Sequence, residues 1–246
     1  MRLAYFRFYE ELNDFLPQHR RKVTFQYEFM GKPSVKDAIE ALGVPHVEVD
    51  LIIVNGESAD FSRSLKDGDK ISVYPVFEGL DISPLIRLRE KPLREVKFIL
   101  DTHLGRLAKY LRFCGFDTLF DNYYDDPEIV DISVIEKRTI LTRDRGILKN
   151  SRVTHGYWVR SQKPEEQLKE VFKRLDLNSQ VRLFTRCIIC NTLLEDIDKE
   201  DIKERLQPTT RRFFSVFKQC PGCNRIYWKG SHYENMIRYI DQIISE

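Results

Sequence analysis

The sequence predicts a multi-domain α/β protein, and three observations lead to this prediction. Residues 1–77 read as strand, strand, helix, strand and strand, which is the order of a small α+β sheet of the β-grasp type. Strands and helices then alternate through residues 96–178, as in a parallel sheet covered by helices on both faces. Two Cys-x-x-Cys pairs follow near the C-terminus, which is typical of a small module folded around zinc.

The composition fits this division and excludes strongly charged classes of protein. The 246 residues suit two or three domains, and a hydrophobic fraction of 42% can build a core in each. Residues 1–80 carry a net charge of −3 and the rest +5, so the later part is mildly basic. That charge is compatible with a polyanionic partner and equally with an ordinary solvated surface.

We expect a cytoplasmic protein without a membrane span. The start, MRLAYFRFYEELNDF, contains no uninterrupted apolar run of the kind found in a secretory leader. No stretch approaches the roughly 20 apolar residues that a membrane helix needs. Four of the five cysteines fall in the two pairs, which indicates metal ligation in a reducing compartment rather than disulfides.

In the N-terminal domain, residues 1–80, the first two strands should pair as a hairpin. Ser34 is placed to cap a helix over residues 35–43 that ends at Gly43. The third strand runs into an Asn-Gly turn, which favours a tight reversal. Residues 81–95 contain two prolines and many charges and are expected to be a linker. The expected strands cover residues 2–9, 22–29, 47–57 and 70–77.

The central domain, residues 96–178, should hold four strands and three helices. Its first helix carries one apolar stripe, on which Cys114 is expected to be a core residue. The expected strands cover residues 96–100, 116–120, 138–142 and 156–160. The expected helices cover residues 104–114, 125–138 and 163–175.

Three acidic positions should share one edge of this sheet. Asp101 directly follows the first strand, and Asp144 follows the third after one intervening arginine. Asp126, with its neighbour Asp125, begins the helix between them. The carboxyl ends of parallel strands open onto one crevice, and carboxylates gathered there repel unless a cation neutralises them. Mg²⁺ and Mn²⁺ prefer oxygen ligands and can activate water, so this pattern indicates metal-assisted phosphodiester hydrolysis.

Each acid also has a purely structural explanation. Asp126 before Pro127 is typical of a helix N-cap, and Asp144 can cap a turn before Gly146. His103 is more simply a local hydrogen-bonding residue than a ligand. Basic side chains near the acids are candidates for holding the phosphates of such a phosphodiester, and the resemblance described below implies that the substrate is RNA. These are Arg106, Lys109, Arg112, Arg143 and Arg145.

The cysteine pairs predict one structural zinc site in residues 179–246. Cys187 and Cys190, with Cys220 and Cys223, supply four thiolates from two tight turns, whereas a redox Cys-x-x-Cys would not explain two pairs. Asn224 can adopt the left-handed backbone conformation that such a turn needs. Basic and aromatic residues of this module suit single-stranded RNA, although the aromatic ones can equally pack the module. The set is Arg211, Arg212, Phe213, Phe214, Lys218, Arg225, Tyr227, Trp228 and Lys229.

Several segments resemble the Mut-seven C-terminal RNase-like family. They are FILDTHLGRLAKYLRFCGFDTLFDN, DDPEIVDISVIEKRTILTRDRGIL, CIIC and CPGCNRIYWKGSHYENM, in the family's order and spacing over roughly residues 96–240. That family has a PIN-like nuclease-type domain with a zinc ribbon behind it. Residues 1–80 resemble the ubiquitin-like β-grasp domain that often precedes it in prokaryotes.

The resemblance implies a divalent-metal-dependent ribonuclease, a hydrolase with catalytic Asp101, Asp126 and Asp144 binding magnesium or manganese. Asp125 lies beside the second acid, and the fourth acid usual in PIN nucleases falls on Asp121 or Glu128. The alternative is a non-catalytic RNA-binding or protein-docking adaptor on the same fold.

The β-grasp domain also resembles sulfur carriers, which end in Gly-Gly. Here the chain continues as VFEGLDISP, which excludes carrier chemistry and leaves docking of a protein or RNA partner.

Overall fold

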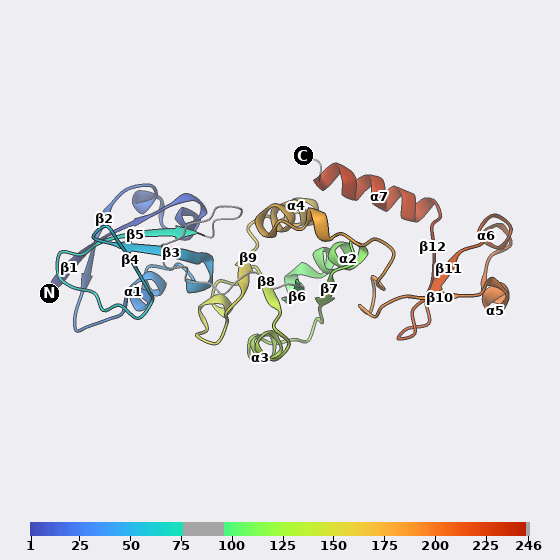
Figure 1. Ribbon diagram of the computed structural model, residues 1–246, viewed down its shortest axis with the longest axis horizontal. Coiled ribbons are helices and arrows are strands. Elements are labelled where there is room, and N and C mark those ends of the chain that lie inside the picture. Colours follow the sequence, from blue (N-terminus) through green and yellow to red (C-terminus); the bar gives the residue numbers. More distant parts are fainter. Residues whose placement is uncertain (76–95, 245–246) are drawn as a thin grey trace. The chain divides into compact units, whose positions relative to one another are not determined.

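Figure 1 shows the computed structural model of the protein, which describes residues 1–75 and 96–244. The expected linker over residues 81–95 and the end of the strand expected over residues 70–77 lie outside the described residues. The chain divides into two compact units, Met1–Glu95 with Val130–Trp158, and Val96–Ile129 with Val159–Glu246. Among the helices of the described residues, none has the length and apolar character to span a bilayer.

The N-terminal part forms the predicted mixed sheet with one α-helix. Its strand order is β2-β1-β5-β3-β4, with β1 parallel to β5 and the other pairs antiparallel. This confirms the ubiquitin-like β-grasp arrangement. The strands are β1 (Arg2–Phe8), β2 (Phe25–Phe29), β3 (Val49–Val54), β4 (Glu57–Ala59) and β5 (Lys70–Pro75). The helix is α1 (Val35–Ala41), and three 3₁₀ turns are η1 (Glu10–Phe15), η2 (Gln18–Arg20) and η3 (His46–Glu48).

Local sequence signals explain where these elements begin and end. The Ser34 hydroxyl accepts a hydrogen bond from the amide of Asp37 at 3.1 Å, and the Asp37 carboxylate accepts one from the amide of Ser34 at 2.9 Å. This reciprocal cap confirms the predicted helix start. Asn55 and Gly56 have φ of 53° and 92°, so the chain reverses there into a separate short strand, β4. The predicted Asn-Gly turn at the end of the third strand is therefore confirmed, and the short strand β4 that follows it was not expected.

The core of this sheet is built by alternation. Along β1, Ala4, Phe6 and Phe8 are fully or almost fully buried, while the side chains between them are more exposed. They pack with Ile39 of α1 and with apolar residues of β3 and β5. One face of the sheet is thereby removed from water by the helix, which is the dominant stabilising term for such a small domain.

The central part is a four-stranded sheet of order β7-β6-β8-β9, with parallel pairing of β6 with β7 and of β8 with β9. This confirms the predicted parallel sheet accompanied by helices. The strands are β6 (Lys97–Leu100), β7 (Asp117–Leu119), β8 (Thr139–Thr142) and β9 (Gly156–Trp158). The helices are α2 (Gly105–Phe113), α3 (Asp126–Glu136) and α4 (Pro164–Leu175), with 3₁₀ turns η4 (Thr102–Leu104) and η5 (Ile147–Lys149). Cys114 is fully buried at the end of α2, as expected, and burial raises the pKa of its thiol to about 12.

The C-terminal part is a three-stranded antiparallel sheet of order β10-β11-β12 with short helices in the long insert. Its strands are β10 (Glu195–Ile197), β11 (Phe217–Gln219) and β12 (Ile226–Trp228). Its helical elements are η6 (Asn178–Gln180), α5 (Lys199–Ile202), η7 (Lys203–Arg205), α6 (Pro208–Phe213) and α7 (Ser231–Ile244). Helix α7 was not expected from the sequence, and it runs beside α4 in Figure 1 and contacts it.

Candidate functional site

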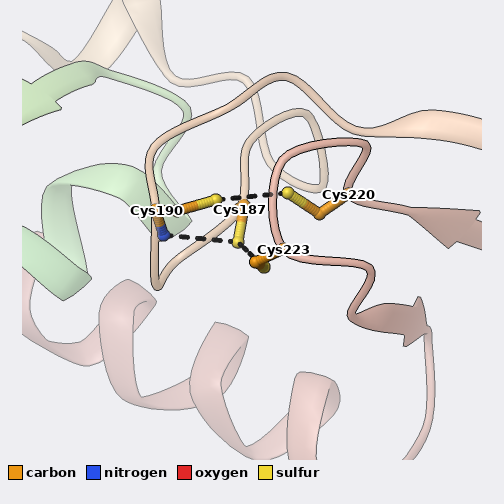
Figure 2. Close-up of side chains that lie close together, drawn as sticks. All are labelled: Cys187, Cys190, Cys220 and Cys223. Carbon is orange, nitrogen blue, oxygen red and sulfur yellow. Dashed lines mark hydrogen bonds between the residues drawn. The ribbon is translucent and has the colours of Figure 1, made fainter.

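The four predicted cysteines come together in the C-terminal module (Figure 2). Their sulfur atoms all lie within 4.8 Å of one another. Cys187 Sγ lies 3.6 Å from Cys223 Sγ, and Cys190 Sγ lies 3.2 Å from Cys220 Sγ. A tetrahedral ion with Zn–S bonds of ~2.3 Å separates its sulfur ligands by about 3.8 Å. The cluster therefore fits one zinc ion with only small side-chain adjustments.

Both cysteine pairs have the same backbone geometry. In the first, the Asn191 amide donates to the Cys187 carbonyl at 3.0 Å, and in the second the Asn224 amide donates to the Cys220 carbonyl at 2.8 Å. Asn191 and Asn224 have φ of 71° and 58°, the left-handed region that asparagine tolerates well. The prediction for Asn224 is confirmed. Asn191 has the same place in the first Cys-x-x-Cys-Asn, a repeat of the motif that could have identified it.

The thiols of the cluster differ in acidity because they share one small space. Burial and the neighbouring thiols raise the pKa of Cys223 to about 12. Burial also opposes ionisation of Cys190, but hydrogen bonds from Thr192 and the adjacent thiols lower its pKa to about 6 overall. The Tyr227 hydroxyl lies 3.0 Å from Cys187 Sγ and can donate to a thiolate there. A divalent cation would remove the repulsion that keeps the other thiols protonated.

The first cysteine turn is anchored to the central domain by buried polar side chains. Arg112 of α2 is only 5% exposed, and its Nε and Nη1 donate to the carbonyls of Thr118 at 2.9 Å and Ile189 at 2.6 Å. Asn191 accepts from the Thr118 amide at 2.9 Å and donates to Asp117 Oδ1 at 2.8 Å. Arg112 was predicted to contact RNA, but its side chain is buried and its guanidinium binds main-chain carbonyls instead.

The long insert between the cysteine pairs builds a small core of its own. Ile202, Leu206 and Phe217 are buried there, with Phe214 and Trp228 packed against them. Phe214 and Trp228 therefore pack the module, which was the alternative to RNA binding for its aromatic residues, whereas Phe213 is 71% exposed. The second cysteine turn also packs closely against the residues after the first, because a Cβ atom added at Gly222 would lie 2.6 Å from Thr192 Oγ1.

Asp101 occupies the expected position at the carboxyl end of β6. It is 7% exposed, and its carboxylate accepts a hydrogen bond from the His103 amide at 2.8 Å, capping η4. The His103 side chain itself is exposed. Its place at the carboxyl end of a parallel strand, where such sheets bind their ligands, makes Asp101 a candidate cation ligand.

The sequence left open whether Asp126 caps a helix or binds a cation, and in the structure the capping is done by its neighbour Asp125. The Asp125 carboxylate accepts from the Glu128 amide at 2.9 Å, and its carbonyl accepts from the Ile129 amide at 3.0 Å. Asp125, rather than Asp126, is therefore the residue that caps α3. Asp126 is the first residue of the helix and is exposed, as are the two candidates for a fourth acid, Asp121 and Glu128.

Asp144 lies in the loop after β8 and is exposed. Its Oδ1 accepts from the Gly146 amide at 2.7 Å, so the turn-capping explanation is correct for this oxygen. In the part of the chain that the structure describes, Oδ2 has no hydrogen-bond partner. One oxygen thus fixes the carboxylate while the other is available for a ligand.

Arg145 beside it contacts the β-grasp domain. Its guanidinium lies 3.9 Å from the Trp158 ring centroid and 5.2 Å from that of Phe15, and Nη1 donates to the Phe15 carbonyl at 3.4 Å. The Trp158 indole N–H donates to the Arg143 carbonyl at 3.2 Å. His46 adds a contact from Nε2 to the Val153 carbonyl at 3.1 Å. The loop that carries Asp144 is therefore held by aromatic and main-chain contacts.

The structure brings the four cysteines together and describes the acids in separate units. Asp101 and Asp126 belong to one compact unit and Asp144 to the other. The gathering of these carboxylates at one edge, with a divalent cation, stays a prediction. Arg106 and Lys109 are exposed on α2, as side chains that bind RNA phosphates must be.

Comparison with known proteins gives matches over both parts of the chain. Residues 1–81 match the model of the Mut7-C ubiquitin family, and residues 96–240 match that of the Mut7-C RNAse domain. Among curated proteins, none matches significantly.

Two solved structures are similar to part of the chain. One is the small archaeal modifier protein 1 of H. volcanii, with 19% identity over 30% of this chain and 98% of that one, at a TM-score of 0.25. The other, of SAMP1 from Haloferax volcanii, has 20% identity over 31% and 98%, also at 0.25. Because the RNAse-domain model alone covers more than half of the residues, this chain belongs to the Mut7-C RNAse domain family, with a Mut7-C ubiquitin domain in front.

Proposed function

We propose that the protein is a divalent-metal-dependent ribonuclease in which Asp101, Asp126 and Asp144 bind Mg²⁺ or Mn²⁺. The observation that carries the proposal is the family match over residues 96–240 together with acids at the ends of β6 and β8 and at the start of α3. When bound, such a cation would activate water and stabilise the charge that develops on the scissile phosphate.

The chain's own residues have distinct parts in this proposal. Buried Asp101 offers a carboxylate held by the His103 amide, and Asp144 offers Oδ2 while Gly146 holds Oδ1. Arg106 and Lys109 on α2 would orient the RNA backbone, as would Arg143 in the loop that carries Asp144. Arg145 would act mainly through its contacts with Phe15 and Trp158, by keeping the loop of Asp144 in place.

We also propose that the four cysteines hold a structural zinc ion that takes no part in the chemistry. Four thiolates complete a tetrahedral shell, so water or substrate has no coordination position. The proposed domains stay as expected from the sequence, with residues 1–80, 96–178 and 179–246 around a linker over residues 81–95. We propose that the β-grasp domain docks a protein or RNA partner. Its contacts with Arg145 and Val153 support this, because they show that its surface can bind other residues.

The test is cleavage of a single-stranded RNA by zinc-loaded protein with added Mg²⁺ or Mn²⁺. Asp101→Asn and Asp144→Asn should each lower the rate at least about 100-fold, since each removes a negatively charged oxygen ligand of the cation. Asp131→Asn is the matched control, because Asp131 is half-exposed on α3 and pairs with Arg152. Equal rates in all the proteins would reject the assignment. Metal-independent RNA binding without turnover would favour the adaptor function.

A further inference from the structure

A pocket of about 260 Å³ lies in the second compact unit, and none of the proposed acids is among its lining residues. It is lined by the end of α2, by residues before, within and after the first cysteine turn, by β12 and by the start of α7. Most of its wall is apolar, and its aromatic members are Phe113, Phe184, Tyr227, Trp228 and Tyr233. Ligand pockets commonly measure about 300–1,000 Å³, so this one suits a single flat ring system rather than a large ligand.

The aromatic side chains of this pocket meet at an angle and are not stacked on one another. The Tyr233 ring centroid lies 5.3 Å from that of Phe184 at 69°, and 5.6 Å from that of Phe113 at 49°. Tilted and edge-on contacts leave part of each ring face uncovered. Phe184 has φ of 62°, a costly backbone conformation for a bulky residue, and it holds the ring at the pocket.

Two cationic side chains lie at the pocket: Arg186, which lines it and pairs with Asp117 at 3.7 Å, and Lys229 beside its aromatic rings. No carboxylate is among its lining residues within the part of the chain described. Lys229 is exposed, and its Nζ lies 5.6 Å from the Phe184 ring and 5.9 Å from the Tyr233 ring. It makes no ion pair in the described residues, whereas Lys218 pairs with Asp196 at 3.1 Å. An unpaired cation beside aromatic faces complements a group that combines a flat ring with an anion.

We propose that this pocket binds one unstacked base of single-stranded RNA, with the adjoining phosphate at Lys229. The inference rests on the proposed ribonuclease function and adds a substrate-binding subsite to it. Aromatic faces bind bases of any sequence by stacking, and a neighbouring lysine binds the backbone. The subsite would bind the RNA strand at the zinc module. Because it takes an unstacked base, we expect single-stranded RNA to bind more tightly than duplex RNA.

The experiment uses the intact zinc-loaded chain carrying Trp158→Phe, so that the second of the two tryptophans, Trp228, reports from the pocket wall. An oligouridylate is added without Mg²⁺ or Mn²⁺ so that it is not cut. We expect Trp228 emission to be quenched on binding. Tyr233→Leu should weaken binding about 5- to 100-fold through lost stacking, while Tyr233→Phe keeps the ring and should bind like the parent.

The phosphate contact is tested by salt dependence. Lys229→Gln should reduce the slope of log K against log salt by about 0.7, the value for one phosphate contact on a single strand. Lys203→Gln, which removes an exposed lysine paired with Glu200, should change neither slope nor affinity.

Two results would overturn the subsite. One is RNA binding, measured by anisotropy, without any change in Trp228 emission. That result would favour an apolar protein partner as the occupant of the pocket. The other is equal affinity of Tyr233→Leu and Tyr233→Phe. The ribonuclease proposal fails separately: if Asp101→Asn cleaves normally while Tyr233→Leu loses binding, the subsite stands and the catalytic assignment does not.

Discussion

Replacing Arg112 with methionine should loosen the zinc module from the central domain. Arg112 is 5% exposed, and its guanidinium reaches from α2 to the loop between Cys187 and Cys190. Methionine has a similar volume and fills the same space without any donor. The carbonyls of Thr118 and Ile189 would then each lose a hydrogen bond from a charged donor.

The expected magnitude follows from these two contacts. A hydrogen bond to a charged group contributes about 1.5–3 kcal/mol, so losing two costs about 3–6 kcal/mol. Methionine also avoids the desolvation of a buried cation, which offsets part of the loss. Burial already lowers the pKa of Arg112, which is the sign of that desolvation. We expect a net loss of about 2–4 kcal/mol in the free energy of unfolding.

The assay is urea unfolding followed by circular dichroism, with zinc release to a chelating dye recorded in parallel. Arg112→Met should unfold at a lower urea concentration and release zinc faster than the wild type. Arg106→Met is the matched control, because Arg106 is exposed on the same helix and its replacement should cost no more than about 0.5 kcal/mol. Identical unfolding midpoints for the two variants would refute the anchoring role of Arg112.

Three other predictions concern the zinc ligands, the anchor of the first cysteine turn and the buried thiol at the end of α2. Cys220→Ser should lower the zinc content from about one ion per chain toward zero, measured by mass spectrometry of the metal, and a retained ion would contradict four-thiolate binding. Asn191→Ala should destabilise the chain by about 2–3 kcal/mol in urea unfolding, and Asn191→Gly by less because glycine accepts φ of 71°; equal losses would refute the role of backbone conformation. Burial raises the pKa of Cys114 from 9.0 to about 12, so its thiol contributes stability that is fully present below pH 9 and lost as pH rises toward 12. Relative to Cys114→Ala, the wild type should lose about 1.4 kcal/mol per pH unit in that window, and parallel pH profiles would reject this reasoning.

Local signals made much of the fold predictable. Ser34 with Asp37 fixes a helix start within four residues, and Asn55-Gly56 fixes a turn, because both act through adjacent backbone groups. The cysteine pairs are equally local, since each supplies two ligands from one turn. Such features can be recognised in a sequence without knowledge of which distant segments meet.

Residues that act at long range were harder to predict. Arg112 belongs to a run of basic residues on α2, and only the position of the first cysteine turn shows that it points inward. Asn191 likewise bonds Thr118, which lies 73 residues earlier. By contrast, α7 did have a sequence signal, because Tyr233, Met236 and Ile240 recur at helical spacing.

The most direct test of the proposed function is a crystal structure of the zinc-loaded protein soaked in MnCl₂. We expect anomalous density for manganese in contact with the carboxylates of Asp101 and Asp144, in addition to zinc at the four cysteines. Zinc at the cysteines with no manganese at either carboxylate would contradict a metal-dependent active site there.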